Sequence, residues 1–412
     1  MTPQGKKYTA LFALLQGAFW SSNCMLYAFL INIYAEYGIS MLMAGFTLTL
    51  FSLVTIVVQP LMGYISDTFL PAKRLLLLCF SAAAALTLVL PFCLRSSQWL
   101  GIVVIVLISA FDYSIYTVID VWAIKTISEN PGMEFAVVRS GGSVSYAVTA
   151  LVMGTVIHTA GVNLLFTGHF VMLLLCIASS LFLKEYPCAN SRKYPGSRLV
   201  NAPAGDSLFS AMKQLFTNPR YVVAVLALAI YQFAMRVTQS YLTVIIEHFG
   251  GNSQHMGITL FLGASLEALV MLAIGKLISR GANLTYTYLS FLCVAAVRIA
   301  CLLIPGGVLV PMLSQMIQAC AVGIYLRVFP DYISSVTPKH LTATACTFAI
   351  ALSIGAGSLP GNMLGGWMME HHGVDSYITA STIISIISIA LFLPNVFAER
   401  SRKKQCETEP TA

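Results

Sequence analysis

Charged residues are scarce in this sequence, and their scarcity excludes most classes of soluble protein. Only 9% of the 412 residues are Asp, Glu, Lys or Arg, whereas 58% are apolar and the mean hydropathy is +0.81. A soluble globular protein carries roughly 25% charged residues, so this composition cannot supply a water-exposed surface. We therefore read the net charge of +7 as a sign of membrane topology and not of nucleic-acid binding.

Motifs for metals, nucleotides and catalysis are also missing. The ten cysteines form no Cys-x-x-Cys pair and no zinc-ligand spacing, and most lie inside apolar runs, so we expect free thiols and no metal site. There is no Walker-type phosphate loop, which argues against ATP-driven transport. No Ser/His/Asp set is placed for catalysis, so we expect neither an enzyme nor a cofactor. The first apolar run is too long for a cleavable signal peptide.

Long apolar runs are what the sequence has instead. Crossing a hydrocarbon core of roughly 30 Å takes about 20 apolar residues. We place twelve such runs, at 9–35, 41–66, 73–94, 99–124, 138–161, 163–183, 220–246, 255–275, 282–304, 307–329, 341–368 and 374–397. The prediction is an all-α membrane protein with twelve transmembrane helices in two six-helix halves.

The polar stretch 184–219 is the expected linker between these halves. It is rich in Pro, Gly, Ser and basic residues and separates an N-terminal half at 1–183 from a C-terminal half at 220–397, which a tail at 398–412 follows. Eighteen lysines and arginines fall on the side of the termini and linker, against Arg95 alone on the other side. This asymmetry predicts that both termini are cytoplasmic. Two such halves suit alternating access around a solute site near the midplane.

Charges inside the apolar runs give the sharpest functional signal. A charge at the bilayer centre costs about 2.5–3.5 kcal/mol on insertion scales and usually faces a bundle interior or an aqueous cavity. A structural ion pair or a position at a helix end explains Arg236 as well as a functional role does, and explains Arg327 better. The set as a whole nevertheless indicates a path for a polar solute. The charges are Asp112, Asp120, Arg139, Arg236, Glu267, Arg298 and Arg327.

Asp120, Arg139 and Tyr146 are the best candidates for binding that solute. Asp120 comes late in one run and Arg139 early in the next, so a short loop allows the two charges to meet. A carboxylate accepts hydroxyl hydrogen bonds and a guanidinium donates from a rigid fork, a combination that suits a polyhydroxylated ligand. Tyr146 lies two turns beyond Arg139, where its ring can stack on a sugar. In the first run, Asn23 and Tyr27 recur at helical spacing with Gln16 and are expected to face the same cavity.

The loop after the second run resembles the signature of the major facilitator superfamily. It has Gly63, then Asp67 four residues on, then the basic pair Lys73 and Arg74, although Thr-Phe-Leu-Pro stands where the superfamily usually has a basic residue and Gly. We expect Gly63 to allow close approach of two helices and Asp67 to face the start of a neighbouring helix, where the macrodipole favours negative charge. The resemblance implies a loop that takes part in conformational change.

The segment from Glu134 to Tyr146 resembles the entry to helix 5 of lactose permease and its relatives, the oligosaccharide:proton symporters. The resemblance implies that Arg139 binds substrate and that Tyr146 takes the place of an aromatic, Trp, under the sugar. It also matches Asp120 to the family's substrate-binding acid and Tyr27 to a tyrosine in helix 1.

In the second half, Glu267 resembles the helix 8 glutamate that couples sugar to proton, and Arg298 resembles the helix 9 arginine. One departure matters, because Gln318 and Ala321 stand where the family has its helix 10 His and proton-accepting Glu. Neither side chain titrates, so Arg298 lacks its expected acidic partner. If protons are coupled, we expect Glu267, Asp112 or Asp120 to carry them.

These observations predict a permease that moves a small polar solute, a sugar or glycoside with protons. The alternatives are a permease for aromatic acids such as phenylpropionate, or for other organic anions, and a membrane sensor that binds solute without moving it. Besides the solute and H⁺, we expect the lipid bilayer as partner and no nucleic acid. The expected location is a bacterial inner membrane, as a multi-pass monomer.

Overall fold

The computed structural model describes residues 3–130, 133, 135–186, 208–338 and 341–408, and these residues are helical or in short connections, with no strand among them. The predicted linker 184–219 lies partly outside this set, at 187–207. The chain forms two compact units, Met1–Asn201 with Gly251–Ala264, and Ala202–Gly250 with Ser265–Ala412.

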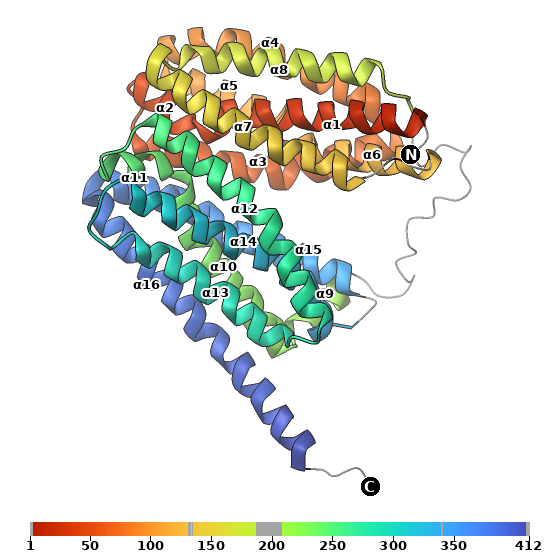
Figure 1. The fold of residues 1–412 in the computed structure, drawn as a ribbon, viewed down its shortest axis with the longest axis vertical. Helices are drawn as coiled ribbons and strands as arrows, with labels where there is room; N and C mark the ends of the chain where they lie inside the picture. The colour runs from red at the N-terminus through yellow and green to blue at the C-terminus, as the bar shows by residue number, and fades with distance from the viewer. Residues whose placement is uncertain (1–2, 131–132, 134, 187–207, 339–340, 409–412) are drawn as a thin grey trace. The chain divides into compact units, whose positions relative to one another are not determined.

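Unit 1 is a bundle in which α1 lies against α7 and α8, and α8 also packs on α4 (Figure 1). A π-turn, η1, interrupts the first helix, and a 3₁₀ turn, η2, interrupts the fourth span. Its elements are α1 (Pro3–Asn23), η1 (Cys24–Ala28), α2 (Leu30–Glu36), α3 (Met41–Thr68), α4 (Ala72–Ser96), α5 (Gln98–Phe111), η2 (Tyr113–Ile115), α6 (Tyr116–Glu129), α7 (Phe135–Ala160), α8 (Asn163–Leu181) and the first part of α12 (Ser253–Ser279).

Unit 2 packs α10 against α16, and α13 against both α14 and α16. Its centre is aromatic, with Tyr288 stacked on Phe392 at 4.7 Å between ring centroids and edge-on to Phe291. Its elements are α9 (Leu208–Phe216), α10 (Pro219–Ser240), α11 (Leu242–His248), the rest of α12, α13 (Leu284–Cys301), α14 (Leu309–Val336), α15 (Thr342–Ser353), the π-turn η4 (Ile354–Ser358) and α16 (Leu359–Thr408).

Helix boundaries follow from local capping chemistry. Asn218 caps α10 by accepting from the backbone N–H of Arg220 at 3.1 Å, with Pro219 in the first turn. Asn283 caps α13 in the same way, accepting from the N–H of Thr285 at 3.0 Å. Gly373 has φ 76° and ψ 177°, which is not helical, so α16 is two helices joined across a kink.

Ten helices of the described chain are long and apolar enough to cross a membrane, or eleven if the bent pair Gly5–Ala28 and Leu30–Glu36 is one span. The last of them, Ala345–Arg402, includes the kink at Gly373. Large apolar side chains such as Phe92, which is 70% exposed, face outward, as the lipid-facing surface of a membrane bundle requires. The expected class of all-α membrane protein is confirmed.

Candidate functional site

Asp120 belongs to a chain of polar contacts that three helices of unit 1 contribute. The side-chain amide of Gln16 on α1 donates to Asp120 Oδ1 on α6 at 2.6 Å. Trp20 Nε1 donates to Gln16 Oε1 at 3.1 Å, and the guanidinium of Arg139 on α7 lies 5.1 Å from the centre of the Trp20 ring. We call these four residues the Asp120 chain.

Local sequence explains how the Asp120 chain is assembled. Gln16 and Trp20 are four residues apart, so they lie on one face of α1. The backbones of α1 and α7 approach closely, because a Cβ on Gly141 would come within 3.1 Å of the Ala13 carbonyl oxygen. A Cβ on Gly142 would collide with the Trp20 indole. Small residues at this helix contact therefore leave the space that Trp20 occupies.

Asp120 and Arg139 are close enough to attract each other electrostatically, but they form no ion pair within the described residues. We expected the two charges side by side, and Gln16 and Trp20 join them instead. Neither the Arg139 guanidinium nor Asp120 Oδ2 has a hydrogen-bond partner among the residues the structure describes. The Asp120 chain thus presents a guanidinium donor and a carboxylate oxygen that are open to a ligand.

Tyr146 is half-buried on α7, two turns beyond Arg139. The ring that contacts Arg139 is Trp20, which we had noted only as one of several polar residues of the first run. From Trp20, a row of aromatic rings continues through Tyr116 at 6.3 Å and Tyr113 at a further 6.3 Å to Tyr27. Aromatic surface therefore borders the Asp120 chain on the α1 and α6 side.

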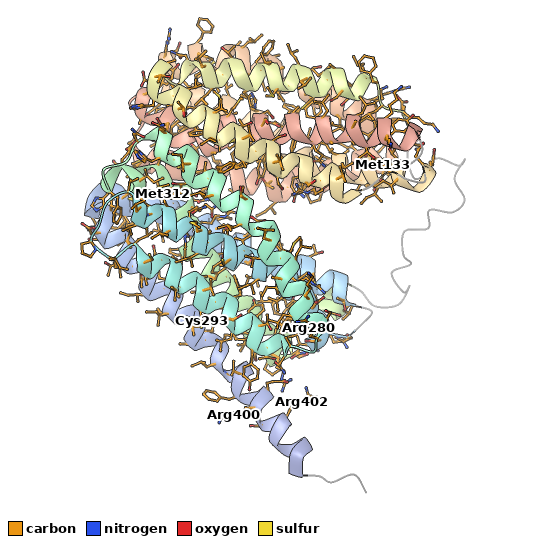
Figure 2. The ribbon with its side chains drawn as sticks, viewed as in Figure 1. Met133, Arg280, Cys293, Met312, Arg400 and Arg402 are labelled. Atoms are coloured by element: carbon orange, nitrogen blue, oxygen red, sulfur yellow. The ribbon has the colours of Figure 1, made fainter. Side chains whose placement is uncertain are left out.

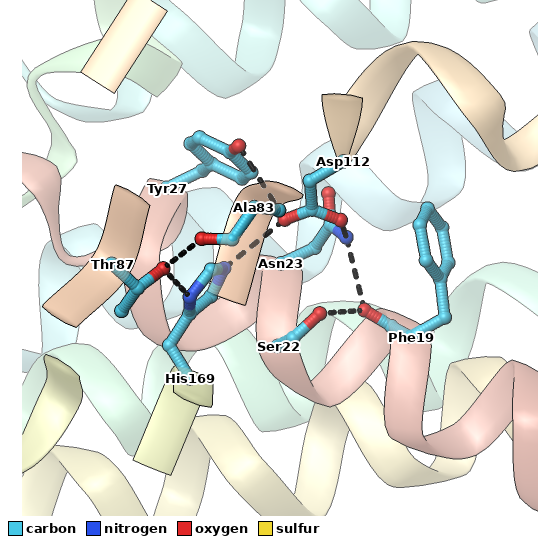
Figure 3. A network of polar contacts seen from close by, with 8 residues as sticks. All are labelled: Phe19, Ser22, Asn23, Tyr27, Ala83, Thr87, Asp112 and His169. Atoms are coloured by element: carbon cyan, nitrogen blue, oxygen red, sulfur yellow. Dashed lines mark hydrogen bonds and ion pairs between the residues drawn. The ribbon is translucent and has the colours of Figure 1, made fainter. Parts of the chain in front are cut away.

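Asn23 and Tyr27, which we expected to face the solute cavity, point to Asp112 (Figure 3). Asn23 Nδ2 donates to Asp112 Oδ1 at 3.2 Å, and the Tyr27 hydroxyl donates to Oδ2 at 3.5 Å. Asp112 itself is completely buried, between the end of α5 and η2. These two residues therefore satisfy a buried carboxylate.

His169 on α8 is the residue that the sequence reasoning missed. It is completely buried, and its Nε2 lies 3.1 Å from Asp112 Oδ2 while its Nδ1 lies 2.9 Å from the Thr87 hydroxyl of α4 (Figure 3). We counted Asp, Glu and Arg within the apolar runs but not His. A count that included histidine would have found His169 in the middle of the run 163–183.

Arg298 and Glu267 both lie in unit 2. Arg298 is buried and donates to the Thr238 hydroxyl and to Gln315 Oε1, the latter at 3.3 Å. Both partners are neutral, and no acidic residue of the described chain pairs with Arg298. Glu267 is half-buried on α12.

The helix 10 positions that carry protons in lactose permease-like proteins are non-titrating here. Gln318 is buried and donates to Gln239 Oε1 at 3.4 Å, and Ala321 lies in the apolar core of unit 2. Any proton site of this chain lies elsewhere.

Of the four residues predicted to form a conformational loop, Gly63 and Asp67 lie near the end of α3, and Lys73 and Arg74 lie in the first turn of α4. Lys73 Nζ donates to the carbonyl oxygens of Leu181 and Leu183 at the end of α8, at 2.8 Å each. Arg74 pairs with Glu185 at 2.9 Å. These contacts tie the start of α4 to the end of α8.

Asp67 pairs with Lys125, in the last turns of α6, at 3.7 Å. That Asp67 faces the start of a neighbouring helix stays a prediction. The expectation about Gly63 was wrong, because no atom of another described helix lies within 4 Å of a Cβ built on it, and so no close helix approach depends on it in this conformation. Nearby, a hydrogen bond from Lys184 to Glu129 at 3.0 Å, with their mutual attraction, raises the pKa of Lys184.

Sequence comparison places these features in a known group. The chain matches the MFS_1 like family over residues 10–380. It is 24% identical to the maltose permease of Geobacillus stearothermophilus over 358 residues, which is 87% of this chain and 86% of that protein. It is 22% identical to the uncharacterized transporter YwbF of Bacillus subtilis (strain 168) over 402 residues, which is 96% of this chain and 95% of that protein.

Solved structures support the same fold. The nucleoside transporter NupG superposes with a TM-score of 0.75 at 16% identity, covering 96% of this chain and 98% of NupG. The POT family transporter PepTSo superposes with a TM-score of 0.70 at 10% identity, covering 98% of this chain and 99% of PepTSo. The family consists of transporters, which confirms that the chain is not an enzyme. This multi-pass membrane protein belongs to the MFS_1 like family and is a secondary transporter of the major facilitator superfamily.

Proposed function

We propose that this transporter imports a small sugar or glycoside by alternating access, in symport with protons. The Asp120 chain is the observation that carries the proposal. Asp120 Oδ2 and the Arg139 fork are open to a ligand, while Gln16 and Trp20 hold them in place. A carboxylate acceptor and a bidentate donor bind neighbouring hydroxyl groups of one sugar ring, and the aromatic side chains of Trp20 and Tyr146 offer faces for its apolar side.

The family relation supports a sugar as the solute, since one relative is named a maltose permease. At 24% identity the name does not carry over by itself. Support from this chain itself comes from Asp120, Arg139 and Tyr146, whose chemistry suits a ligand with hydroxyl groups and a ring with an apolar face. Asn23 and Tyr27, which we first assigned to the solute, now support Asp112 instead.

We also propose twelve spans, with the boundary between the last two at Gly373 and a cytoplasmic linker at 184–219. Basic residues of unit 2 support cytoplasmic termini. Arg280, Arg400 and Arg402 lie toward one end of this unit, and Met312 lies toward the other (Figure 2). Lysine and arginine are concentrated on the cytoplasmic side of membrane proteins. The two bacterial relatives favour a bacterial inner membrane.

Uptake of radiolabelled maltose into proteoliposomes tests the function, with and without an inward proton gradient. We expect uptake in both conditions and accumulation above equilibrium only with the gradient. Asp120→Asn is expected to lose both, because the neutral amide has one acceptor oxygen where the carboxylate has two, and Gln16 already donates to one of them. Ser143→Ala, an exposed change on α7, serves as the control. Binding of maltose without any flux would favour a solute sensor.

Buried Arg298 supports one second candidate, an organic anion as the solute. Its described partners are the neutral side chains of Thr238 and Gln315, so a positive charge is left uncompensated within unit 2. A carboxylate ligand such as phenylpropionate would neutralise it. Uptake of labelled phenylpropionate that disappears in Arg298→Gln, in a protein that does not move maltose, would replace the sugar proposal.

A further inference from the structure

Asp112 and His169 form a buried pair that transport of a neutral sugar does not itself require. Both side chains are completely buried, and the pair is held in place by Asn23, Tyr27 and Thr87. The 3.1 Å separation of His169 Nε2 from Asp112 Oδ2 requires a proton between them, since two bare acceptors would repel each other.

The hydroxyl of Thr87 fits two protonation states of this pair. It lies 2.9 Å from His169 Nδ1 and 2.7 Å from the Ala83 carbonyl oxygen (Figure 3). When Nδ1 has no proton, the hydroxyl donates to it. When Nδ1 has one, the hydroxyl accepts from Nδ1 and donates to Ala83 instead. Rotation of a single O–H thus completes the hydrogen bonds of both states.

Charge differs between the two states by one proton. Without the added proton, Asp112 is negative and His169 neutral, and the pair carries one buried negative charge. With it, the pair is neutral overall, whether the proton stays on the imidazole or on the carboxyl group. No lysine or arginine of the described chain pairs with Asp112, so the added proton is what compensates its charge.

Breaks in two helices meet at this pair. Asp112 follows the last residue of α5, directly before the 3₁₀ turn η2. Asn23 is the last residue of α1, and Tyr27 lies within the π-turn η1. π-turns and short 3₁₀ stretches within helices often mark functional positions and hinges. A change of charge at Asp112 therefore acts where the backbone of both helices is least regular.

We propose that Asp112 and His169 together bind one proton and that this is the proton the transporter moves with its solute. The proposal rests on the proposed symport, and it assigns the proton site to unit 1 and not to the helix 10 positions Gln318 and Ala321 of unit 2. Four other titratable groups lie around Asp112. Tyr27 of η1, Cys79 of α4 and Cys176 of α8 interact with it, and Tyr113 follows it directly in η2 and contacts the Tyr27 ring edge-on. All four are neutral as phenol or thiol, so the pair alone changes charge.

Nitrogen-15 NMR of protein labelled at its seven histidines and reconstituted in lipid tests the site without any solute. The His169 signal is the one missing from His169→Gln. We expect its Nδ1 to gain a proton as the pH is lowered, because the Thr87 hydroxyl can accept from the protonated Nδ1. In Asp112→Asn we expect one neutral form throughout, since the added proton would then leave a buried positive charge.

His158→Gln is the matched control, because His158 is an exposed histidine of α7 and its loss should leave the His169 titration unchanged. An unchanged protonation of His169 Nδ1 over the whole pH range in wild-type protein would overturn the site. This measurement is made on wild-type protein, so it tests the site even if Asp112→Asn does not fold.

Transport of labelled maltose then tests coupling. Asp112→Asn is expected to keep counterflow, the exchange of maltose without a gradient, and to lose accumulation driven by an inward proton gradient. Gradient-driven accumulation at the wild-type level in this variant would refute the coupling role. If wild-type protein moves no maltose in either assay, the proposed function fails for this sugar, and the NMR titration alone decides whether the proton site exists.

Discussion

Gly142→Ala is the substitution that most directly tests the Asp120 chain. The new Cβ would collide with the Trp20 indole, and it would also lie 3.0 Å from Trp20 Nε1. The indole has to move, so we expect it to lose its contact with Arg139 and its hydrogen bond to Gln16. Arg139 then no longer has a fixed position from which to donate to the solute.

The size of the effect follows from the contact that is lost. A cation–π contact contributes about 0.5 kcal/mol at exposed sites and about 2 kcal/mol where it is desolvated. Each 1.4 kcal/mol changes an equilibrium constant tenfold, so the half-saturating maltose concentration should rise roughly 2-fold to 30-fold. Counterflow in proteoliposomes, with the amount of folded protein matched, measures this concentration.

Two neighbouring substitutions separate site effects from packing effects. Gly141→Ala crowds the Ala13 carbonyl but not Trp20, so it should lower the thermal unfolding temperature with little change in half-saturation. Ser143→Ala is exposed and should change neither quantity. If folded Gly142→Ala has the same half-saturating concentration as Ser143→Ala, the reasoning about Trp20 and Arg139 is refuted.

Three further predictions concern separate parts of the molecule. Tyr146→Ala should abolish maltose binding and Tyr146→Trp should retain part of it in the counterflow assay, and equal losses would contradict stacking on the sugar. Lys73→Met removes two hydrogen bonds to carbonyl oxygens at the end of α8 and should lower the free energy of unfolding, measured by thermal denaturation, by about 1 kcal/mol. Arg74→Met removes an exposed ion pair and should lower the free energy of unfolding clearly less than Lys73→Met does. Equal losses in the two variants would contradict the view that Lys73 holds the end of α8. Arg298→Lys keeps the charge but loses the guanidinium that donates to two partners. We expect the free energy of unfolding to fall by roughly 1–3 kcal/mol. An unchanged unfolding temperature would mean that the fork does not matter.

Hydropathy was sufficient to locate the helices, because a span has to be apolar over most of its length. The run 73–94 became α4 (Ala72–Ser96), and 163–183 became α8 (Asn163–Leu181). The interruptions η1 and η2 were not predicted, since both lie inside runs that are apolar on either side of the break. A π-turn or a 3₁₀ turn has no composition of its own that a sequence pattern could reveal.

The candidate site was predicted by residue type but not by contact. Sequence placed Asp120 and Arg139 on adjacent helices, but their pairing depends on the rotation of each helix and on what the third helix inserts. Here α1 inserts Gln16 and Trp20 between them. The partner of Asp112 was missed for another reason. His169 is 57 residues away along the chain and is uncharged in its neutral form, so a search for permanent charges passes over it.

The π-turn η1 gives the first helix one residue more than a regular α-helix needs over the same stretch. Removing one residue from Cys24–Ala28 would restore i→i+4 pairing without opening the backbone to lipid. Side chains beyond the turn would keep their orientation, since the π-turn is one residue inserted into an otherwise regular helix. Tyr27 lies within the turn itself, so the deletion would shift it relative to Asp112, while Asn23, which precedes the turn, would keep its contact. The helix can thus lose a residue and remain a span, but only by disturbing one of the two donors that it directs at the buried acid.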